Sequence, residues 1–127
     1  MSEVLPGEIY LARNGSRKTR PFVILSQSTF NRGHYCLAVP FTTGRLAQRR
    51  DLPNCVFFRK GTFGLAKSCV AQAEALTLIR KSDFVQPLSR LGKVSQVRMT
   101  ALVAAVGYVI GADCKPLAAP RPTQGAG

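Results

Sequence analysis

Short apolar runs alternate with polar loops through the first 60 residues of the chain. The runs cover residues 7–12, 21–25, 35–41 and 55–58, and they are rich in β-branched and aromatic side chains. Apolar runs of this length, bounded by Gly, Pro and Asn, are typical of β-strands rather than of helices. The pattern therefore predicts four strands in this half of the chain.

The next part of the chain has a less decisive pattern. After a turn through Gly61 and Gly64, residues 68–79 contain alanines that suit a helix, but also a partial alternation that suits a strand. Because the segment follows other strands, we predict that it is a fifth strand. Residues 80–94 are interpreted as a connection with a helical turn near residues 82–84.

Residues 95–110 carry the clearest helical periodicity. Ser95 can cap the start of this helix, and Gly111 can end it. Gly107 lies inside and costs about 1 kcal/mol relative to alanine, which favours close packing of that turn against a sheet. Apolar residues recur at steps of three and four and predict one buried face, formed by Met99, Leu102, Val103, Val106, Val109 and Ile110.

These elements predict a mainly β protein with a C-terminal helix, in the α+β class. About five antiparallel strands would form a small, strongly bent sheet or half-open barrel, with the helix packed across it. A length of 127 residues suits one domain, which we place at residues 1–112. Residues 113–127 are rich in Pro and Gly and are expected to be a disordered tail.

The composition adds a strong positive charge. The chain has 18 Lys and Arg against 6 Asp and Glu, a net charge of +12, which favours nucleic acid, an acidic membrane face or an acidic protein as partner. No apolar stretch approaches the roughly 20 residues of a membrane span. The first ten residues lack the pattern of a secretory signal. We expect a cytoplasmic protein without disulfides, not bound to a membrane.

The cysteines and the histidine do not form a recognisable metal-binding pattern. There is no C-x-x-C pair among Cys36, Cys55, Cys69 and Cys114, and His34 is the single histidine. A zinc site is therefore not expected. The first three cysteines are interpreted as small core residues and Cys114 as an exposed thiol beside the tail. His34, in a Gly-rich segment, is interpreted as a turn residue.

The remaining polar residues suit a reaction that needs neither metal nor cofactor. The sequence lacks a nucleophile elbow, a Walker-type phosphate loop and a dinucleotide-binding fingerprint. Cations and hydroxyls at strand ends remain, and these suit cleavage of RNA, because the ribose 2′-OH is a nucleophile that the substrate already contains. An arginine fork and a threonine hydroxyl can stabilise charge on the phosphate oxygens.

Several short motifs resemble those of a known family. Arg20-Pro21 with Ser26, then Phe30-Asn31, then Pro40-Phe41-Thr42 follow Gly7-Glu8-Ile9 in order and at suitable spacing. This series resembles the MazF/PemK (Kid) toxins of bacterial toxin–antitoxin pairs. Looser matches follow at residues 64–68, 71–79 and Leu91-Gly92, so the resemblance covers about residues 6–111.

The resemblance implies an SH3-like barrel of the CcdB/MazF type and a homodimer. It also implies a metal-independent endoribonuclease that cuts single-stranded RNA at short sequences and leaves a 2′,3′-cyclic phosphate and a 5′-OH. The family's arginine falls on Arg20 and its threonine on Thr42. Where the family commonly has an acid followed by Gln, this chain has Glu74-Ala75, so Glu74 is interpreted as a general base or as a residue that positions an arginine. An acidic, partly disordered antitoxin would be the inhibitor.

Two polar loops, residues 13–19 and 44–54, concentrate positive charge. This charge either keeps the surface soluble or binds phosphates and acidic antitoxin side chains, and we favour the second interpretation. Asn31 is interpreted as a cap of a turn. The residues expected to bind RNA are Arg13, Asn14, Arg17, Lys18, Thr43, Arg45, Arg49, Arg50 and Gln72.

Other interpretations stay open at this level. A CcdB-like protein would inhibit DNA gyrase without cutting RNA, and a plain nucleic-acid-binding module would have no target enzyme and no catalytic site. Arg20 could be a solvated loop cation, and Thr42 could bond its own backbone at a strand end.

Overall fold

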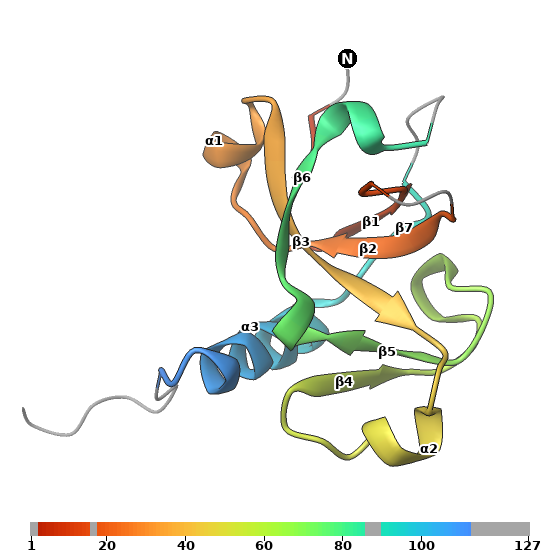
Figure 1. Cartoon of the computed structure of the whole chain (residues 1–127). Coiled ribbons are helices and arrows are strands. Elements are labelled where there is room, and N and C mark those ends of the chain that lie inside the picture. Colours follow the sequence, from red (N-terminus) through yellow and green to blue (C-terminus); the bar gives the residue numbers. More distant parts are fainter. Residues whose placement is uncertain (1–2, 16–17, 86–89, 113–127) are drawn as a thin grey trace, which may run out of the picture.

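A computed structural model describes residues 3–15, 18–85 and 90–112. Within these ranges the chain forms seven strands, three α-helices and three single 3₁₀ turns, labelled η (Figure 1). In chain order they are β1 (Glu8–Ala12), β2 (Arg20–Ile24), α1 (Ser28–Asn31), β3 (Tyr35–Thr42), α2 (Leu46–Arg49), β4 (Cys55–Phe58), η1 (Thr62–Gly64), β5 (Cys69–Gln72), η2 (Ala73–Ala75), β6 (Thr77–Arg80), η3 (Lys81–Asp83), β7 (Gly92–Lys93) and α3 (Gln96–Val109).

The strands form one bent antiparallel sheet in the order β4-β5-β3-β2-β1-β7, and β6 also pairs with β3. β3 is the longest strand and lies in the middle. One of its edges pairs with β2 and the other pairs first with β6 and then with β5. Figure 1 shows β3 running from the segment after α1, past β2, towards β4 and β5. The prediction of a mainly β, strongly bent sheet with a C-terminal helix is confirmed.

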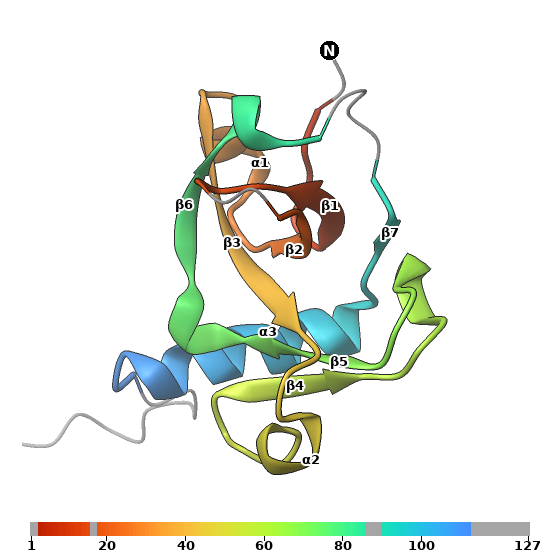
Figure 2. The ribbon, with the colours of Figure 1, turned by 45° about the vertical axis from the view of Figure 1, so that its right-hand side comes forward.

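Apolar side chains on the two faces of the sheet form separate cores. Val39 and Phe41 of β3 belong to the core that also holds Leu102 of α3. Ala38 of β3 and Phe22 of β2 belong to the other core. Figures 1 and 2 show α3 lying alongside β4 and β5, where it covers the first core. The alternation of side chains along a strand explains why neighbouring residues of β3 serve different cores.

The four predicted strands of the first half are confirmed, but the single strand predicted at residues 68–79 is wrong. It is two strands, β5 and β6, separated by η2. The break lets both strands pair with the same edge of β3. β5 pairs with the last residues of β3, and η2 then carries the chain to the first half of β3, where β6 pairs. The turn predicted at residues 82–84 exists as η3, one residue earlier. The short elements α1, α2 and β7 were not predicted.

The C-terminal helix is confirmed with the predicted cap. The Ser95 hydroxyl accepts a hydrogen bond from the Arg98 backbone N–H at 3.3 Å, and Gly111 follows the helix with a φ of +79°. The apolar face is only partly right. Leu102 is buried and Met99 and Val106 pack against the core, as expected.

The other predicted members of that face are exposed: Val103, Val109 and Ile110. In their place the small residues Ala105 and Gly107 are buried. Small residues allow the helix to lie close to its neighbours β4 and η2, so the buried stripe of α3 runs along these small residues. The valines outside this stripe face away from the sheet. Hydrophobicity alone could not reveal this orientation, since α3 is apolar on several sides.

The cysteines behave as predicted where the structure describes them. Cys36, Cys55 and Cys69 are free and buried. Cys114 and the expected tail lie outside the described residues, so the division into a domain and a tail stays a prediction. No helix in the described ranges is long and apolar enough to cross a membrane.

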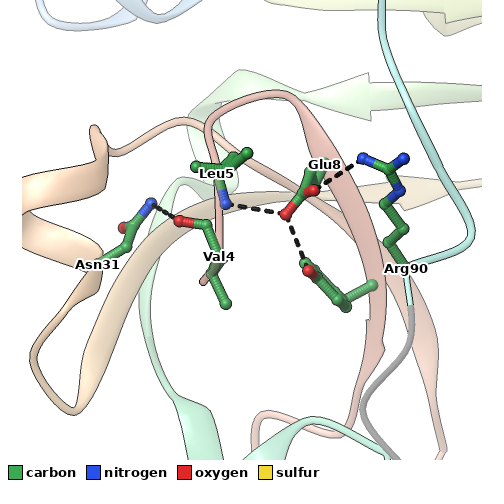
Figure 3. Close-up of polar contacts among 6 residues, drawn as sticks. Val4, Leu5, Glu8, Asn31 and Arg90 are labelled. Carbon is green, nitrogen blue, oxygen red and sulfur yellow. Dashed lines mark hydrogen bonds and ion pairs between the residues drawn. The ribbon is translucent and has the colours of Figure 1, made fainter. Parts of the chain in front are cut away.

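A buried carboxylate joins three segments at one end of the sheet. Glu8, only 4% exposed, accepts hydrogen bonds at Oε1 from the Leu5 backbone N–H and the Tyr10 hydroxyl, both at 2.8 Å. Its Oε2 accepts from Arg90 at 2.9 Å (Figure 3). Burial, and next the bond to Glu8, raises the pKa of Tyr10 above its usual value. Glu8 of the Gly-Glu-Ile motif therefore has a structural role.

Asn31 of the Phe-Asn motif is also buried and structural. Its Nδ2 donates to the backbone oxygens of Val4 at 3.0 Å and Ser26 at 2.8 Å, and its Oδ1 accepts from the Ser26 hydroxyl. Figure 3 shows Asn31 reaching from the end of α1 to the N-terminal segment. Asn31 thus closes the turn that begins at Ser26, as predicted.

Replacing Glu8 by glutamine is expected to lower the free energy of unfolding by about 2 kcal/mol, because the amide loses the ion pair and leaves one buried polar group poorly matched. Unfolding in urea measures the change. Glu3→Gln is the control, since Glu3 lies 3.7 Å from Arg32 with both side chains at least half exposed; it should change stability by less than about 0.5 kcal/mol. Equal effects of the two substitutions would contradict the structural role of Glu8.

Candidate active site

A groove of about 300 Å³ crosses one face of the sheet near the basic loop. Phe22 and Pro40, which are paired across β2 and β3, line it together with residues from both sides of that pair. Its full lining is Arg13, Asn14, Arg20, Phe22, Pro40, Ala75 and Thr77. Three residues expected to act on RNA, Arg13, Asn14 and Arg20, therefore lie together in one groove.

The β1–β2 hairpin positions these cations. Arg20 is the first residue of β2 and pairs with Ala12, the last residue of β1, so Arg13 follows at the same end. Asn14 has a φ of +44° and Gly15 one of +80°, a left-handed pair that begins the loop. Arg20 is thus held by a paired strand, while the loop that follows Arg13 carries more charge. Arg17 of this loop lies outside the described residues, and Lys18 is exposed.

Thr42 lies at the last residue of β3, two residues beyond Pro40. Arg20 is likewise two residues from Phe22 towards the same end, so the register brings Arg20 and Thr42 to one end of the β2–β3 ladder. The Thr42 hydroxyl oxygen accepts a hydrogen bond from the Gly44 backbone N–H at 3.2 Å. The backbone contact considered from the sequence therefore exists, and the hydroxyl proton can still be donated to another group.

A second, apolar cavity of about 200 Å³ borders Thr42. Arg20 and Phe22 line the groove, whereas Pro21 between them lines this cavity, so the two hollows flank the start of β2. Burial raises the pKa of the Cys69 thiol to about 11, which disfavours its reactive thiolate form at neutral pH. The cavity is lined by Pro21, Phe41, Thr42, Thr43, Leu65, Ala66, Lys67 and Cys69.

Glu74 lies in η2, next to Ala75 of the groove wall. Its two carboxylate oxygens accept hydrogen bonds from Asn54 at 2.7 Å and from Gln72 at 3.1 Å. The partners that the structure gives it are thus amides, where the sequence suggested an arginine. Glu74 is exposed, so its carboxylate stays accessible to solvent beside the groove.

The cations of the second polar loop lie apart from both cavities. Arg45 and Arg49 belong to the α2 segment, and the Arg50 guanidinium lies 4.1 Å from the centroid of the Phe57 ring. Neither cavity is lined by any of the three. Among the residues predicted to bind RNA, Arg13 and Asn14 lie at the groove, Thr43 lies at the apolar cavity, and Gln72 holds Glu74.

Four groove residues were not predicted as site residues: Phe22, Pro40, Ala75 and Thr77. Lys67 at the apolar cavity was also missed. Pro40 and Lys67 both belong to motifs that the sequence analysis quoted, so the motifs held a signal for them. Ala75 and Thr77 lie in the looser match at residues 71–79, but their place at the groove depends on the break between β5 and β6 and could not be predicted. In the described part of the chain, no three His, Cys, Asp or Glu residues cluster as metal ligands would.

Solved structures with this fold are numerous. An endoribonuclease in complex with its cognate antitoxin, from a mycobacterial species, is 24% identical over 85% of this chain and 95% of its own, with a TM-score of 0.70. A further mycobacterial endoribonuclease is 22% identical over 91% and 98%, with a TM-score of 0.71. A MazE–MazF structure from Deinococcus radiodurans is 17% identical over 89% and 100%, with a TM-score of 0.70. A search of curated proteins finds no match.

The fold is therefore that of the MazF-type toxins, a small curled sheet with a C-terminal helix. The family model of the PemK-like, MazF-like toxins of type II toxin–antitoxin systems matches residues 5–110. The chain belongs to this family.

Proposed function

We propose that this toxin is a metal-independent endoribonuclease that cuts single-stranded RNA at short sequences. The observation that carries the proposal is the position of Arg20, fixed at the start of a paired strand, in one groove with Arg13 and Asn14. Structural neighbours named as endoribonucleases support it. A groove with a cationic side suits a phosphate chain better than a neutral ligand.

In this proposal Arg20 binds the scissile phosphate. The 2′-OH of the ribose on the 5′ side of this phosphate attacks phosphorus and gives its proton to a base, and the bond from phosphorus to the 5′-oxygen of the next nucleotide breaks. The products are a 2′,3′-cyclic phosphate and a 5′-OH once the leaving oxygen takes a proton. The planar fork of Arg20 donates to the phosphate oxygens as charge builds, and the Thr42 hydroxyl adds one donor.

Glu74 is the candidate for the base or for a residue that orients the groove wall. Its bonds to Asn54 and Gln72 fix the carboxylate next to Ala75, which lines the groove. If Glu74 is the base, Glu74→Gln should lower the rate while leaving RNA affinity nearly unchanged.

The proposed partners follow from charge and from the family. A net charge of +12 favours single-stranded RNA and an acidic antitoxin that competes for the same groove. Two of the neighbours are structures with a partner: an endoribonuclease in complex with its cognate antitoxin, and MazE–MazF. We propose that this chain likewise binds a cognate antitoxin and acts as a homodimer in the cytoplasm, without a cofactor.

Incubating the purified protein with a long RNA in EDTA tests the function. Discrete cuts that leave 5′-OH ends are expected, because no step requires a metal ion. Mapping these ends also gives the recognised sequence. Intact RNA would refute the nuclease, and loss of DNA supercoiling by gyrase with RNA intact would support a CcdB-like inhibitor instead.

A further inference from the structure

A second cluster of polar and cationic side chains lies beyond the groove, where β6 ends. His34, Tyr35, Arg80, Lys81 and Ser82 line a hollow of about 410 Å³. Tyr35 and Arg80 are paired across β3 and β6, and the Lys81 backbone N–H donates to the His34 oxygen at 2.8 Å. None of these residues lines the groove or the apolar cavity.

The cluster combines charge with an aromatic ring. The Arg80 guanidinium lies 5.5 Å from the centroid of the Tyr35 ring and donates to the Tyr35 hydroxyl at 3.1 Å. Both side chains are exposed, and the lining contains no carboxylate. Cations that face phosphates, next to a ring on which a base can stack, are the combination that proteins use to bind single-stranded nucleic acid.

The position of the cluster relative to the groove supports the same ligand. Thr77 lines the groove, and Arg80 lies three residues further along β6, about 10 Å away at the usual rise of a strand and on the opposite face, so an RNA that occupies both sites passes around the edge of β6. On the other side of the cluster, η3 is bonded to a residue of the groove: the Asp83 backbone oxygen accepts a hydrogen bond from the Arg13 backbone N–H at 3.0 Å. In Figure 1, η3 is the turn after the upper end of β6.

We propose that His34, Tyr35, Arg80, Lys81 and Ser82 form a second binding site for single-stranded RNA, which holds nucleotides that flank the cut. Arg80 and Lys81 each bind a phosphate, and Tyr35 offers the ring for stacking. The inference rests on the proposed nuclease function, since the groove must hold the scissile phosphate for the cluster to hold a flank. The proposal predicts that an RNA long enough to reach the cluster binds more tightly than a short RNA that fills only the groove.

The test compares the affinities of 2′-O-methyl oligouridines of 5 and 13 nucleotides for the full chain, measured by fluorescence anisotropy. Arg80→Gln with Lys81→Gln should lower the ratio of the two affinities about tenfold near 50 mM salt, since two phosphate contacts are lost. The slope of log affinity against log salt for the longer RNA should become shallower by about 1.4, or about 0.7 for each contact.

Lys60→Gln with Lys93→Gln is the matched control, because it removes the same charge from two exposed residues outside all three hollows. This control should keep the wild-type affinity ratio and slope. Tyr35→Leu should lower the affinity for the longer RNA about fivefold, since a ring for stacking is lost.

Two results would overturn the proposal. One is an equal change in the control pair, which would mean that net charge alone matters. The other is an unchanged ratio of the two oligouridine affinities in the variant with Arg80→Gln and Lys81→Gln, combined with weaker binding of polyglutamate by that variant. This result would make the cluster a surface for an acidic peptide. Because 2′-O-methyl RNA cannot be cut, binding is measured independently of cleavage. A wild-type protein that leaves long RNA intact would refute the nuclease, whatever the affinity ratio shows.

Discussion

Replacing Arg20 by alanine should lower the rate of RNA cleavage by about 100- to 1,000-fold, the usual effect of removing one donor that stabilises a transition state. Arg20 is exposed and its side chain is not part of either core, so the fold should be unchanged. The rate under single-turnover conditions measures the chemical step. The loss should fall mainly on kcat, because charge on the phosphate oxygens grows as the transition state forms.

Two further variants make the Arg20 result specific. Arg20→Lys keeps the charge but loses the planar fork, so it should recover only part of the rate. Arg59→Ala removes an exposed arginine that lines neither the groove nor the apolar cavity, and it should cut RNA at the wild-type rate. A full rate in Arg20→Ala would disprove the site. A full rate in Arg20→Lys would show that charge alone is needed there.

Sequence reasoning was most successful where local pattern decides the structure. The first four strands follow from short runs of β-branched and aromatic residues, and the cap of α3 follows from Ser95. Arg13, Asn14 and Arg20 could be placed together because a hairpin brings the two ends of its loop to one edge. These features depend on residues that are close together in the chain, so the sequence alone is enough to predict them.

Sequence reasoning failed where contacts between distant segments decide. The break between β5 and β6 depends on both strands sharing one edge of β3. The buried stripe of α3 depends on what lies beneath Ala105. Likewise, the contact of the Arg50 guanidinium with Phe57 of β4 joins two separate segments, while the role of Arg50 in RNA binding stays a prediction. No local sequence pattern predicts these contacts between distant segments.

The motif residues also have two different kinds of role, which a motif does not reveal. Arg20 and Thr42 lie at one end of the β2–β3 ladder, and both are at least partly exposed. Glu8 and Asn31 are buried and join segments through hydrogen bonds. Gly64 and Gly92, from the looser matches, are of the second kind. They allow two backbones to touch.

η1 and β7 approach so closely that neither glycine has room for a side chain. A Cβ on Gly64 would lie 2.0 Å from the Leu91 backbone oxygen, and a Cβ on Gly92 would lie 2.0 Å from the Phe63 oxygen. Leu65 and Lys67, which follow η1, line the apolar cavity beside Thr42. The contact of the two glycines therefore holds one wall of that cavity.

Gly64→Ala should lower the free energy of unfolding by about 4 kcal/mol, a large part of the stability of a domain of this size. About 3 kcal/mol would come from forcing two backbones apart and about 1 kcal/mol from the left-handed φ of +82°. Gly61→Ala separates the two causes, since Gly61 has a φ of +88° but nothing within 4 Å of a Cβ, and it should cost only about 1 kcal/mol.

Gly92→Ala completes the set, because it introduces the clash without a left-handed φ and should cost about 3 kcal/mol. Unfolding in urea at one temperature ranks the three variants as Gly64, Gly92 and Gly61, from the largest loss to the smallest. If Gly61→Ala cost as much as Gly64→Ala, backbone conformation rather than the contact between η1 and β7 would explain both glycines. The predicted ranking would instead show that the family-like glycines maintain the wall beside Thr42 by letting two peptide backbones meet.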